Sequence, residues 1–298
     1  PLDFFTAETS TDAPRGLIVN NKELYVFGSR QGNIFYDSGN LNDPFIQRPG
    51  GIIQYGIAAN NSLIQFADSI FLLGANKDGW KVFLEVRGYE EAVISDPGLE
   101  ATLNGYATVT DCIGFTQDFL GHQFLWFYFP TANATHVYDL TTKMWHERSG
   151  AFTAAGAPIA HRAACATFWD SSYIIGDHSN GIIYKMSTAQ ASDNGTAISR
   201  LRRAPYISRG TDYTYFNSLA VKFATATPSA NPIFRLSISD DGGPNFDTYT
   251  TMQTYRIGNE ASNLRWAESR RLGRSEQRAF QIRVDTPIES IIEAYVDV

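Results

Sequence analysis

The sequence contains little cysteine, no long hydrophobic run and no excess of basic residues. Cys112 and Cys165 are too few for a disulfide framework in 298 residues, and both lie in apolar segments that predict buried free thiols. No apolar run reaches the length of a transmembrane helix, about 18 residues or more, so no membrane anchor is expected. The net charge of −7 is unlike the basic surface that usually grips nucleic acid.

The spacings typical of catalytic, metal and cofactor sites are also missing. The five histidines form no HxxxH, HxH or Cys/His zinc pattern, and no glycine-rich phosphate loop opens a helix. Asp177 and His178 are adjacent in a predicted turn, but no nucleophile-elbow motif accompanies them. We therefore expect no catalytic residue, no metal and no cofactor.

A hairpin pattern recurs through the first two thirds of the chain. Each copy has an apolar segment, a turn with glycine or proline, and a second apolar segment that ends in an aromatic residue. The closing aromatics are separated by 47, 55 and 46 residues, a period typical of four-stranded propeller blades. The copies pair residues 24–28 with 33–36, 70–74 with 80–83, 125–129 with 137–138, and 173–176 with 182–184.

Glycines mark the predicted hairpin turns. Gly28, Gly74, Gly176 and Gly181 are assigned to these turns, with a structural role. Gly74 and Gly176 each follow an apolar segment, and we expect a positive φ at both.

Other segments complete the predicted blades. Feeder strands precede three hairpins at residues 16–21, 62–69 and 165–172, and candidate fourth strands are 45–48, 91–95 and 145–148. One short helix is expected, with Ser95 or Asp96 as N-cap, Pro97 at its first position and Gly105 at its end. Residues 186–200 are expected to form a polar loop.

The pattern changes in the last third. Strands at 219–224, 233–239, 279–284 and 291–296 are longer, and apolar residues alternate with polar ones, which indicates one buried and one wet face. The predicted fold class is therefore all-β. A β-propeller of four-stranded antiparallel blades covers residues 1–205, and a C-terminal antiparallel β region covers 206–298. This second region contains either the last blades or a separate β module.

One turn in the C-terminal region matches an Asp box. Ser239, Asp241, Gly243 and Phe246 fit the pattern Ser-x-Asp-x-Gly-x-x-aromatic directly after a predicted strand. In this motif the carboxylate accepts backbone hydrogen bonds of the turn, so we expect a fold staple and no chemistry. Too few carboxylates lie nearby for a calcium loop.

Arginines cluster around positions 200–203 and 270–278. An arginine-lined site for phosphate or sugar is one interpretation. A solvated strand face, or salt bridges between subunits, is the other.

Several segments resemble a known family. The most distinctive stretch is 129–148, and the likeness extends over about residues 20–190, with weaker likeness at 234–243 and 283–298. These segments resemble the tail-hub proteins of short-tailed bacteriophages, also called packaged-DNA stabilisation proteins.

This resemblance implies a structural virion protein and not an enzyme. It implies a hexameric homo-oligomer ring in the phage tail, assembled in the host cytoplasm, that continues the channel of the portal-adapter (head-to-tail connector) proteins. The ring would retain packaged DNA, let it pass without sequence recognition, and anchor a tail needle, tailspike or fibre. The alternative from the Asp box and arginines is a sialidase-like glycoside hydrolase or a carbohydrate-binding propeller, although no pair of catalytic carboxylates is evident.

Overall fold

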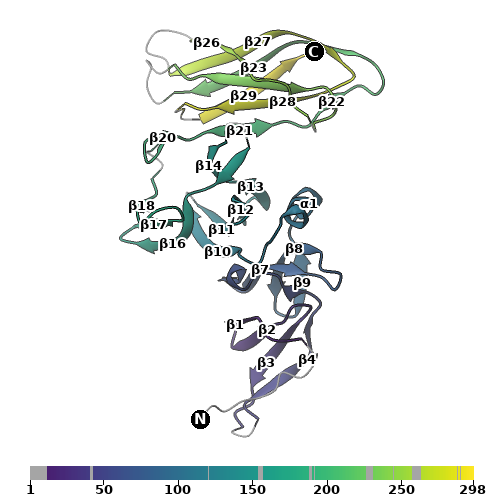
Figure 1. Ribbon diagram of the computed structural model, residues 1–298, viewed down its shortest axis with the longest axis vertical. Coiled ribbons are helices and arrows are strands. Elements are labelled where there is room, and N and C mark those ends of the chain that lie inside the picture. The colour runs from purple at the N-terminus through teal and green to yellow at the C-terminus, as the bar shows by residue number, and fades with distance from the viewer. Residues whose placement is uncertain are drawn as a thin grey trace. The chain divides into compact units, whose positions relative to one another are not determined.

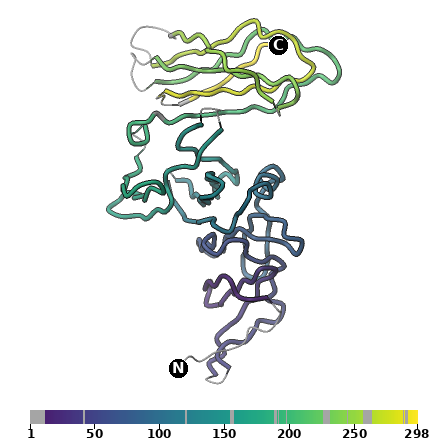
Figure 2. The backbone as a smooth tube through the Cα atoms, viewed as in Figure 1, coloured from purple at the N-terminus to yellow at the C-terminus, as the bar shows by residue number. Residues whose placement is uncertain are grey.

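The chain divides into two compact units, each built almost entirely of antiparallel strands (Figures 1 and 2). Unit 1 contains Pro1–Ser149 and Thr153–Met186, and unit 2 contains Gly150–Phe152 and Ser187–Val298. The computed structural model describes residues 12–40, 43–119, 121–153, 157–187, 190, 192–225, 231–243, 245–256, 263–286, 288 and 290–298.

Four antiparallel sheets follow one another along unit 1. The first sheet contains β1 (Gly16–Asn20), β2 (Glu23–Phe27), β3 (Gly32–Asp37) and β4 (Phe45–Ile53). The second contains β5 (Gly56–Ile57), β6 (Ile64–Phe66), β7 (Ser69–Ala75), β8 (Lys81–Arg87) and β9 (Glu90–Val93). The third contains β10 (Ile113–Phe119), β11 (His122–Phe129), β12 (Ala134–Asp139) and β13 (Met144–Glu147). The fourth contains β16 (Ala163–Trp169), β17 (Ser172–Asp177) and β18 (Ile183–Lys185).

The strand order in these sheets is that of propeller blades. Strands are neighbours in sequence order, and in the second sheet β5 and β6 both pair with β7 and share the outer position. The four predicted hairpins are present as β2–β3, β7–β8, β11–β12 and β17–β18. The predicted fourth strands are confirmed as β4, β9 and β13.

Alternating side chains of the second sheet pack it between its two neighbours. Ile70 and Leu72 of β7 join a buried cluster with the first sheet, whereas Phe71 and Leu73 join a cluster with the third sheet. Every residue of β7 is therefore buried, because both faces of this strand are covered. Stacking of this kind buries apolar faces that a single blade leaves open.

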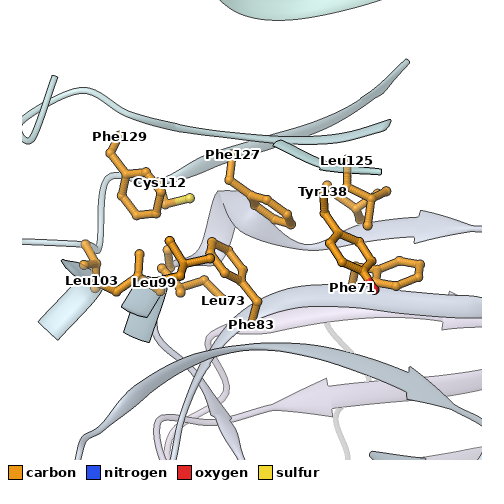
Figure 3. Close-up of a cluster of buried hydrophobic side chains, with 13 residues drawn as sticks. Phe71, Leu73, Phe83, Leu99, Leu103, Cys112, Leu125, Phe127, Phe129 and Tyr138 are labelled. Atoms are coloured by element: carbon orange, nitrogen blue, oxygen red, sulfur yellow. The ribbon is translucent and has the colours of Figure 1, made fainter. Parts of the chain in front are cut away.

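Aromatic rings fill the interface between the second and third sheets (Figure 3). The Phe83 ring lies 4.3 Å from that of Phe127 and 4.6 Å from that of Trp145. Leu99 and Leu103 of the only α-helix in the described residues close one side of this cluster. That helix, α1 (Pro97–Gly105), begins as predicted, since the Asp96 carboxylate accepts the Leu99 N–H at 2.8 Å.

Unit 1 also contains η1 (Asn60–Ser62) and β15 (Pro158–Ala160). β14 (Ser149–Phe152) belongs to unit 2 except for its first residue.

The expected positive φ at two glycines is wrong. Gly74 and Gly176 lie inside β7 and β17, and neither is among the glycines with positive φ. Gly74 is instead required by close approach, because a Cβ there would lie 2.4 Å from Leu84 Cδ1. Gly28 and Gly181 do lie at the hairpin turns, and the Gly28 N–H donates to the Gln31 carbonyl at 2.8 Å.

The expected burial of both cysteines is wrong for one of them. Cys112 is fully buried in the cluster of Figure 3, whereas Cys165 on β16 is exposed. A β-bulge lies between Ala163, which is buried, and Cys165. The bulge shifts the alternation by one residue and turns the Cys165 side chain outward.

Unit 2 contains two sheets that face each other. One has β28 (Gln277–Val284) paired with β24 (Phe234–Ser239), and β21 (Arg200–Arg203) and β22 (Ile207–Ser208) lie on the other side of β28. β25 (Thr250–Thr251) extends this sheet beyond β24. The second sheet has the order β26 (Gln253–Arg256), β27 (Leu264–Ser275), β23 (Thr214–Ala224) and β29 (Ser290–Asp297).

The core of unit 2 lies between these sheets. Phe216 and Phe223 of β23 contact Phe280 and Phe234 of the facing sheet, with ring centroids 5.6 and 4.4 Å apart. The predicted period-2 alternation is confirmed for β23. In β24 and β28 the apolar residues also face this core, but the expectation of a wet opposite face is wrong, because Ser237, Ser239 and Gln281 are buried. The unit is therefore a β-sandwich.

Two local features of unit 2 differ from expectation. β27 was not predicted, because residues 268–271 interrupt its alternation and Arg271 has a φ of 59°. The expected polar loop contains a small hairpin of β19 (Ser192–Asp193) and β20 (Thr196–Ala197), whose Asn194-Gly195 turn has positive φ at both residues. The sequence-based division at residues 205 and 206 stays a prediction, while β21 pairs with β28 inside unit 2.

Candidate functional site

Asp139 lies at the centre of the polar cluster that most resembles a catalytic group. Its Oδ2 atom lies 2.8 Å from His122 Nδ1 and accepts the Thr142 hydroxyl at 2.8 Å, and its Oδ1 accepts the Thr141 N–H. Burial raises the pKa of Asp139, but these hydrogen bonds outweigh it and lower the pKa to about 2. A catalytic triad needs the hydroxyl on the imidazole, whereas both groups here bind the carboxylate. The cluster holds the turn between β12 and β13.

Asp177 caps the turn between β17 and β18 in the same way. Its carboxylate accepts hydrogen bonds from the Ser179 N–H and hydroxyl, both at 2.7 Å, and from Asn180. Arg162 adds an ion pair at 3.2 Å. The neighbouring His178 ring stacks on Tyr128 with centroids 5.0 Å apart and does not contact the carboxylate in a catalytic arrangement. The adjacent acid and imidazole noted in the sequence are therefore separate structural groups.

Of two further histidines of unit 1, His136 is buried and His161 is half-buried. Burial lowers the pKa of His136 to about 4, and its Nε2 atom lies 2.8 Å from the Tyr106 hydroxyl. Burial also lowers the pKa of His161 to about 4, and its Nδ1 atom accepts the Ala163 N–H at 3.1 Å. Both imidazoles are neutral at pH 7, and both belong to the packing of the blades.

The Asp box in unit 2 has the hydrogen bonds of a turn staple. Asp241 accepts the Gly243 and Asn245 N–H groups, each at 3.3 Å, and the Asn245 side chain donates to Asp241 Oδ2 at 2.6 Å. Hydrogen bonds from Ser239 and Asn245 lower the pKa of Asp241 to about 2. Gly243 has a φ of 114°, and Phe246 lies beneath the Arg203 guanidinium at 4.5 Å. Its purely structural role stays a prediction.

Most arginines of unit 2 already have partners. Arg278 is 4% exposed and forms a bidentate ion pair with Asp240 at 2.6 and 2.7 Å. Arg270 pairs with Glu268 at 2.8 Å. Arg235 and Arg283 both contact Asp285, and Arg274 lies over the Tyr213 ring. Arg270, Arg271 and Arg274 lie on β27, in the other sheet from the arginines of β21. Arg278 lies on β28, next to β21, but is held by Asp240, so the two sequence clusters do not form one anion site.

Arg202 is one of the arginines of this unit without such a partner. Within the described part of the chain it has neither a hydrogen bond nor an ion pair, whereas its neighbour Arg203 donates to Gln281 Oε1 at 3.0 and 2.7 Å. No group of three His, Cys, Asp or Glu side chains in the described residues could hold a metal ion. No described helix is long and apolar enough to cross a membrane.

A groove beside Arg202 has no counterpart among the sequence predictions. It has a volume of about 520 Å³ and lies between the two sheets of unit 2, with Phe280, Ala294 and Val296 among its lining residues. A sequence pattern identifies strands, but it does not tell which strands lie at the edge of a sheet. The groove depends on that edge position, so no local signal could have located it.

The acidic character of the chain is confined to one unit. Unit 1 has nineteen acidic and eleven basic side chains, whereas unit 2 has twelve acidic and thirteen basic ones, counting Asp, Glu, Lys and Arg. Unit 1 therefore has a net charge of −8 and unit 2 of +1, which together give the −7 of the chain.

The blades also carry a family signature. Residues 1–191 match the family described as Phage_stabilise, bacteriophage P22 Gp10, β-propeller. The chain belongs to this family. As a member of the Phage_stabilise family it is a bacteriophage structural protein of the virion with a β-propeller fold, and the predicted fold class and the predicted family are confirmed.

Other comparisons add little to the family assignment. No curated protein matches the chain. Among solved structures, a glycoside hydrolase is 10% identical, with 94% of this chain and 83% of that chain covered and a TM-score of 0.20. The exo-inulinase from Aspergillus awamori is 9% identical, with 93% and 96% covered and a TM-score of 0.25. The P. aeruginosa R1 pyocin fiber is 12% identical, with 88% and 78% covered and a TM-score of 0.14. Likenesses this weak support neither a hydrolase nor a fibre function.

Proposed function

We propose that this Phage_stabilise protein is a subunit of a hexameric tail ring that continues the portal-adapter channel. In this role the ring retains packaged DNA, lets it pass during ejection and anchors a tail needle, tailspike or fibre. The family match over residues 1–191 carries the proposal.

The charge distribution supports a channel that does not grip DNA. Phosphates bind to surfaces rich in lysine and arginine, with a strong dependence on salt. The net negative charge of the chain belongs to unit 1, and several arginines of unit 2 are paired with carboxylates or stacked on rings. An acidic lining made by unit 1 would repel phosphate and allow DNA to slide.

Imaging of the assembled tail tests this function directly. We expect the full chain to form a six-membered ring around the channel, with the unit 1 surface facing the lumen. A monomer bound at the tail periphery, or a lumen lined by the arginines near 200–203 and 270–278, contradicts the proposal.

Virions that lack the chain test DNA retention. Phage produced without it should release packaged DNA and become sensitive to nuclease, and supply of the full chain in trans should restore protection. The isolated chain should bind duplex DNA weakly at low salt. A chain that cleaves a fluorogenic sialoside would instead support the hydrolase alternative.

A further inference from the structure

One side of the unit 2 sandwich is open between two edge strands. β21 and β22 form the edge of one sheet, and β29 forms the edge of the other (Figure 1). The groove of about 520 Å³ lies between them, and its walls are mostly apolar, with Leu219, Phe280, Ile282 and Val296 on the core side. The hydrophobic core of unit 2 is therefore continuous with a surface groove.

The residues of β29 that face the core are not covered. Ala294 pairs with Val221 and Val296 pairs with Leu219, and both partners on β23 are buried. Directly opposed residues of neighbouring strands point to the same face of a sheet, so Ala294 and Val296 point toward the core side. Ala294 is nevertheless exposed and Val296 is only half-buried. The sandwich thus presents an inner face that lacks a covering strand.

The two edges differ in how they are protected. Natural sheet edges are commonly blocked by charged side chains and proline, which discourage pairing with another strand. The β21–β22 edge has these features in Arg202, Arg203 and Pro205. β29 is eight residues long and contains no proline, and its two charged residues are Glu293, which is ion-paired with Lys222, and Asp297 at its last position. Among the described strands it pairs only with β23. Its outer backbone groups are therefore available for pairing.

We propose that β29 accepts an extended strand from a different protein, which pairs with its free edge and covers the groove. Apolar side chains at alternate positions of that strand fill the groove, as in other cases of strand addition. An acidic residue of the strand lies near Arg202, which has no partner in the described residues.

Charge favours a different protein over a second copy of this chain. Pairing of two β29 strands would place Glu293 and Asp297 of both copies along one joined edge, where neither strand has a basic residue and Lys222 of β23 is already paired with Glu293. This inference concerns unit 2 alone and does not depend on the proposed function of the ring.

Peptide binding to the full chain tests the proposal. The probe is a synthetic decapeptide in which valine alternates with threonine and one end carries aspartate. A permuted peptide of the same composition, with its valines contiguous, is the control. We expect the alternating peptide to bind and to slow amide exchange in residues 290–297, while the permuted peptide does not. Equal binding of both peptides, or no binding at millimolar concentration, overturns the proposal.

Two variants of β29 locate the bound strand. Ala294→Lys places a charge on the inner, groove-facing side, and we expect it to weaken peptide binding by about tenfold or more. Tyr295→Lys changes the neighbouring residue on the outer face and should leave the affinity within about twofold. Equal affinity of both variants and the unmodified chain would place the peptide elsewhere and reject strand addition at β29.

The Arg202→Ala variant tests whether Arg202 binds an acidic residue of the added strand. The oligomeric state of the chain tests whether the strand comes from a different protein or from a second copy. The substitution should weaken the aspartate peptide more than an asparagine version of it. Equal effects on both peptides overturn the assigned role of Arg202. If the chain dimerises, binds no peptide and becomes monomeric as Ala294→Lys, the occupant is a second copy and the proposed different protein is wrong.

Discussion

Unit 1 and unit 2 reach stability by different means although both are antiparallel β structures. Unit 1 stacks small sheets face to face, so that a central strand such as β7 is buried on both sides. Unit 2 closes two longer sheets over one core and leaves its flank open beside β29. The blades bury their faces against one another, whereas the sandwich keeps a free edge strand.

Their ionisable groups differ as sharply as their sheets. All five histidines and the whole net negative charge belong to unit 1, whereas unit 2 holds most of the arginines and is close to neutral. A unit whose acidic side chains outnumber its basic ones suits a region that must not hold phosphate. The arginine ion pairs of unit 2 lie within that unit, and they suit a region with a structural role. We therefore expect mild acid, and substitutions at closely packed positions, to change the stability of the two units by unequal amounts.

The largest expected effect comes from Gly56 in unit 1. A Cβ at this position would lie 2.1 Å from the Ser29 carbonyl carbon and 2.3 Å from Arg30 N. These are backbone atoms, so the clash cannot be relieved by a side-chain rotation. Gly56→Ala should therefore destabilise the blades by about 3 kcal/mol. Amide exchange should rise in unit 1 more than in unit 2.

Gly181→Ala is the matched control for Gly56→Ala. No atom lies within 4 Å of its added Cβ, and its φ is not positive. Its unfolding free energy should stay within about 0.5 kcal/mol of the unmodified chain. If Gly56→Ala is equally mild, the close contact between β5 and the turn at 28–31 is wrong.

The next largest effect is expected from mild acid, which should lower the stability of unit 1 more than that of unit 2. His136 is 7% exposed and its pKa is about 4, well below the value of about 6.5 in an unfolded chain. The unfolded state then binds more protons between pH 6.5 and 4, so stability is lost as the pH falls through this window. The loss from His136 alone should reach about 3 kcal/mol, and His161, whose pKa is also lowered to about 4, adds to the loss in unit 1. Unit 2 has no histidine and should change little over the same range.

His136→Gln tests the origin of this pH dependence. Glutamine can still reach the Tyr106 hydroxyl but does not titrate. The slope of unfolding free energy against pH, followed by urea denaturation, should become flatter between pH 6.5 and 4. An unchanged slope would assign the dependence to another group.

Local sequence signals predicted the parts of the fold that depend on local chemistry. Hairpins, the fourth strands and the Asp96 cap of α1 follow from alternation, turn residues and capping. The signal failed at β27, where a run of charged residues breaks the alternation, and at Gly74, where a contact from the neighbouring strand and not the turn requires glycine. The predicted burial of Cys165 is wrong because a β-bulge, which the sequence pattern does not reveal, turns its side chain outward.

A substitution in the Asp-box turn of unit 2 should have a smaller effect, and it should change unit 2 instead of unit 1. Asp241→Ala removes the acceptor for the Gly243 and Asn245 N–H groups. The melting temperature of unit 2 should fall, and amide exchange should rise around the turn at 239–247 while the blades are unaffected. Glu276→Ala, at an exposed position of the same unit, should change neither. Altered DNA or sugar binding at an unchanged melting temperature would contradict a structural role.

The candidate sites were harder to predict than the fold. The Asp box could be recognised because its partners lie within a few residues of one another. The pairing of Arg278 with Asp240 and the groove at β29 join residues far apart in sequence, and both depend on strand order. The unequal distribution of charge between the acidic blades and the arginine-rich sandwich likewise becomes apparent only when the boundary between the units is known.

The smallest expected effect concerns Gly176 in the last described blade of unit 1. With no positive φ there, the cost of a side chain reduces to one contact, 3.0 Å between the added Cβ and Cys165 Sγ. Cys165 is exposed and can move, so Gly176→Ala should cost less than about 1 kcal/mol. Removal of the thiol in the double variant with Cys165→Ala should recover that loss, and denaturation of the single and double variants measures the coupling. A loss of several kcal/mol that persists without the thiol would show that the backbone, and not Cys165, requires glycine here, and the blade edge would then be as tightly constrained as the turn at Gly56.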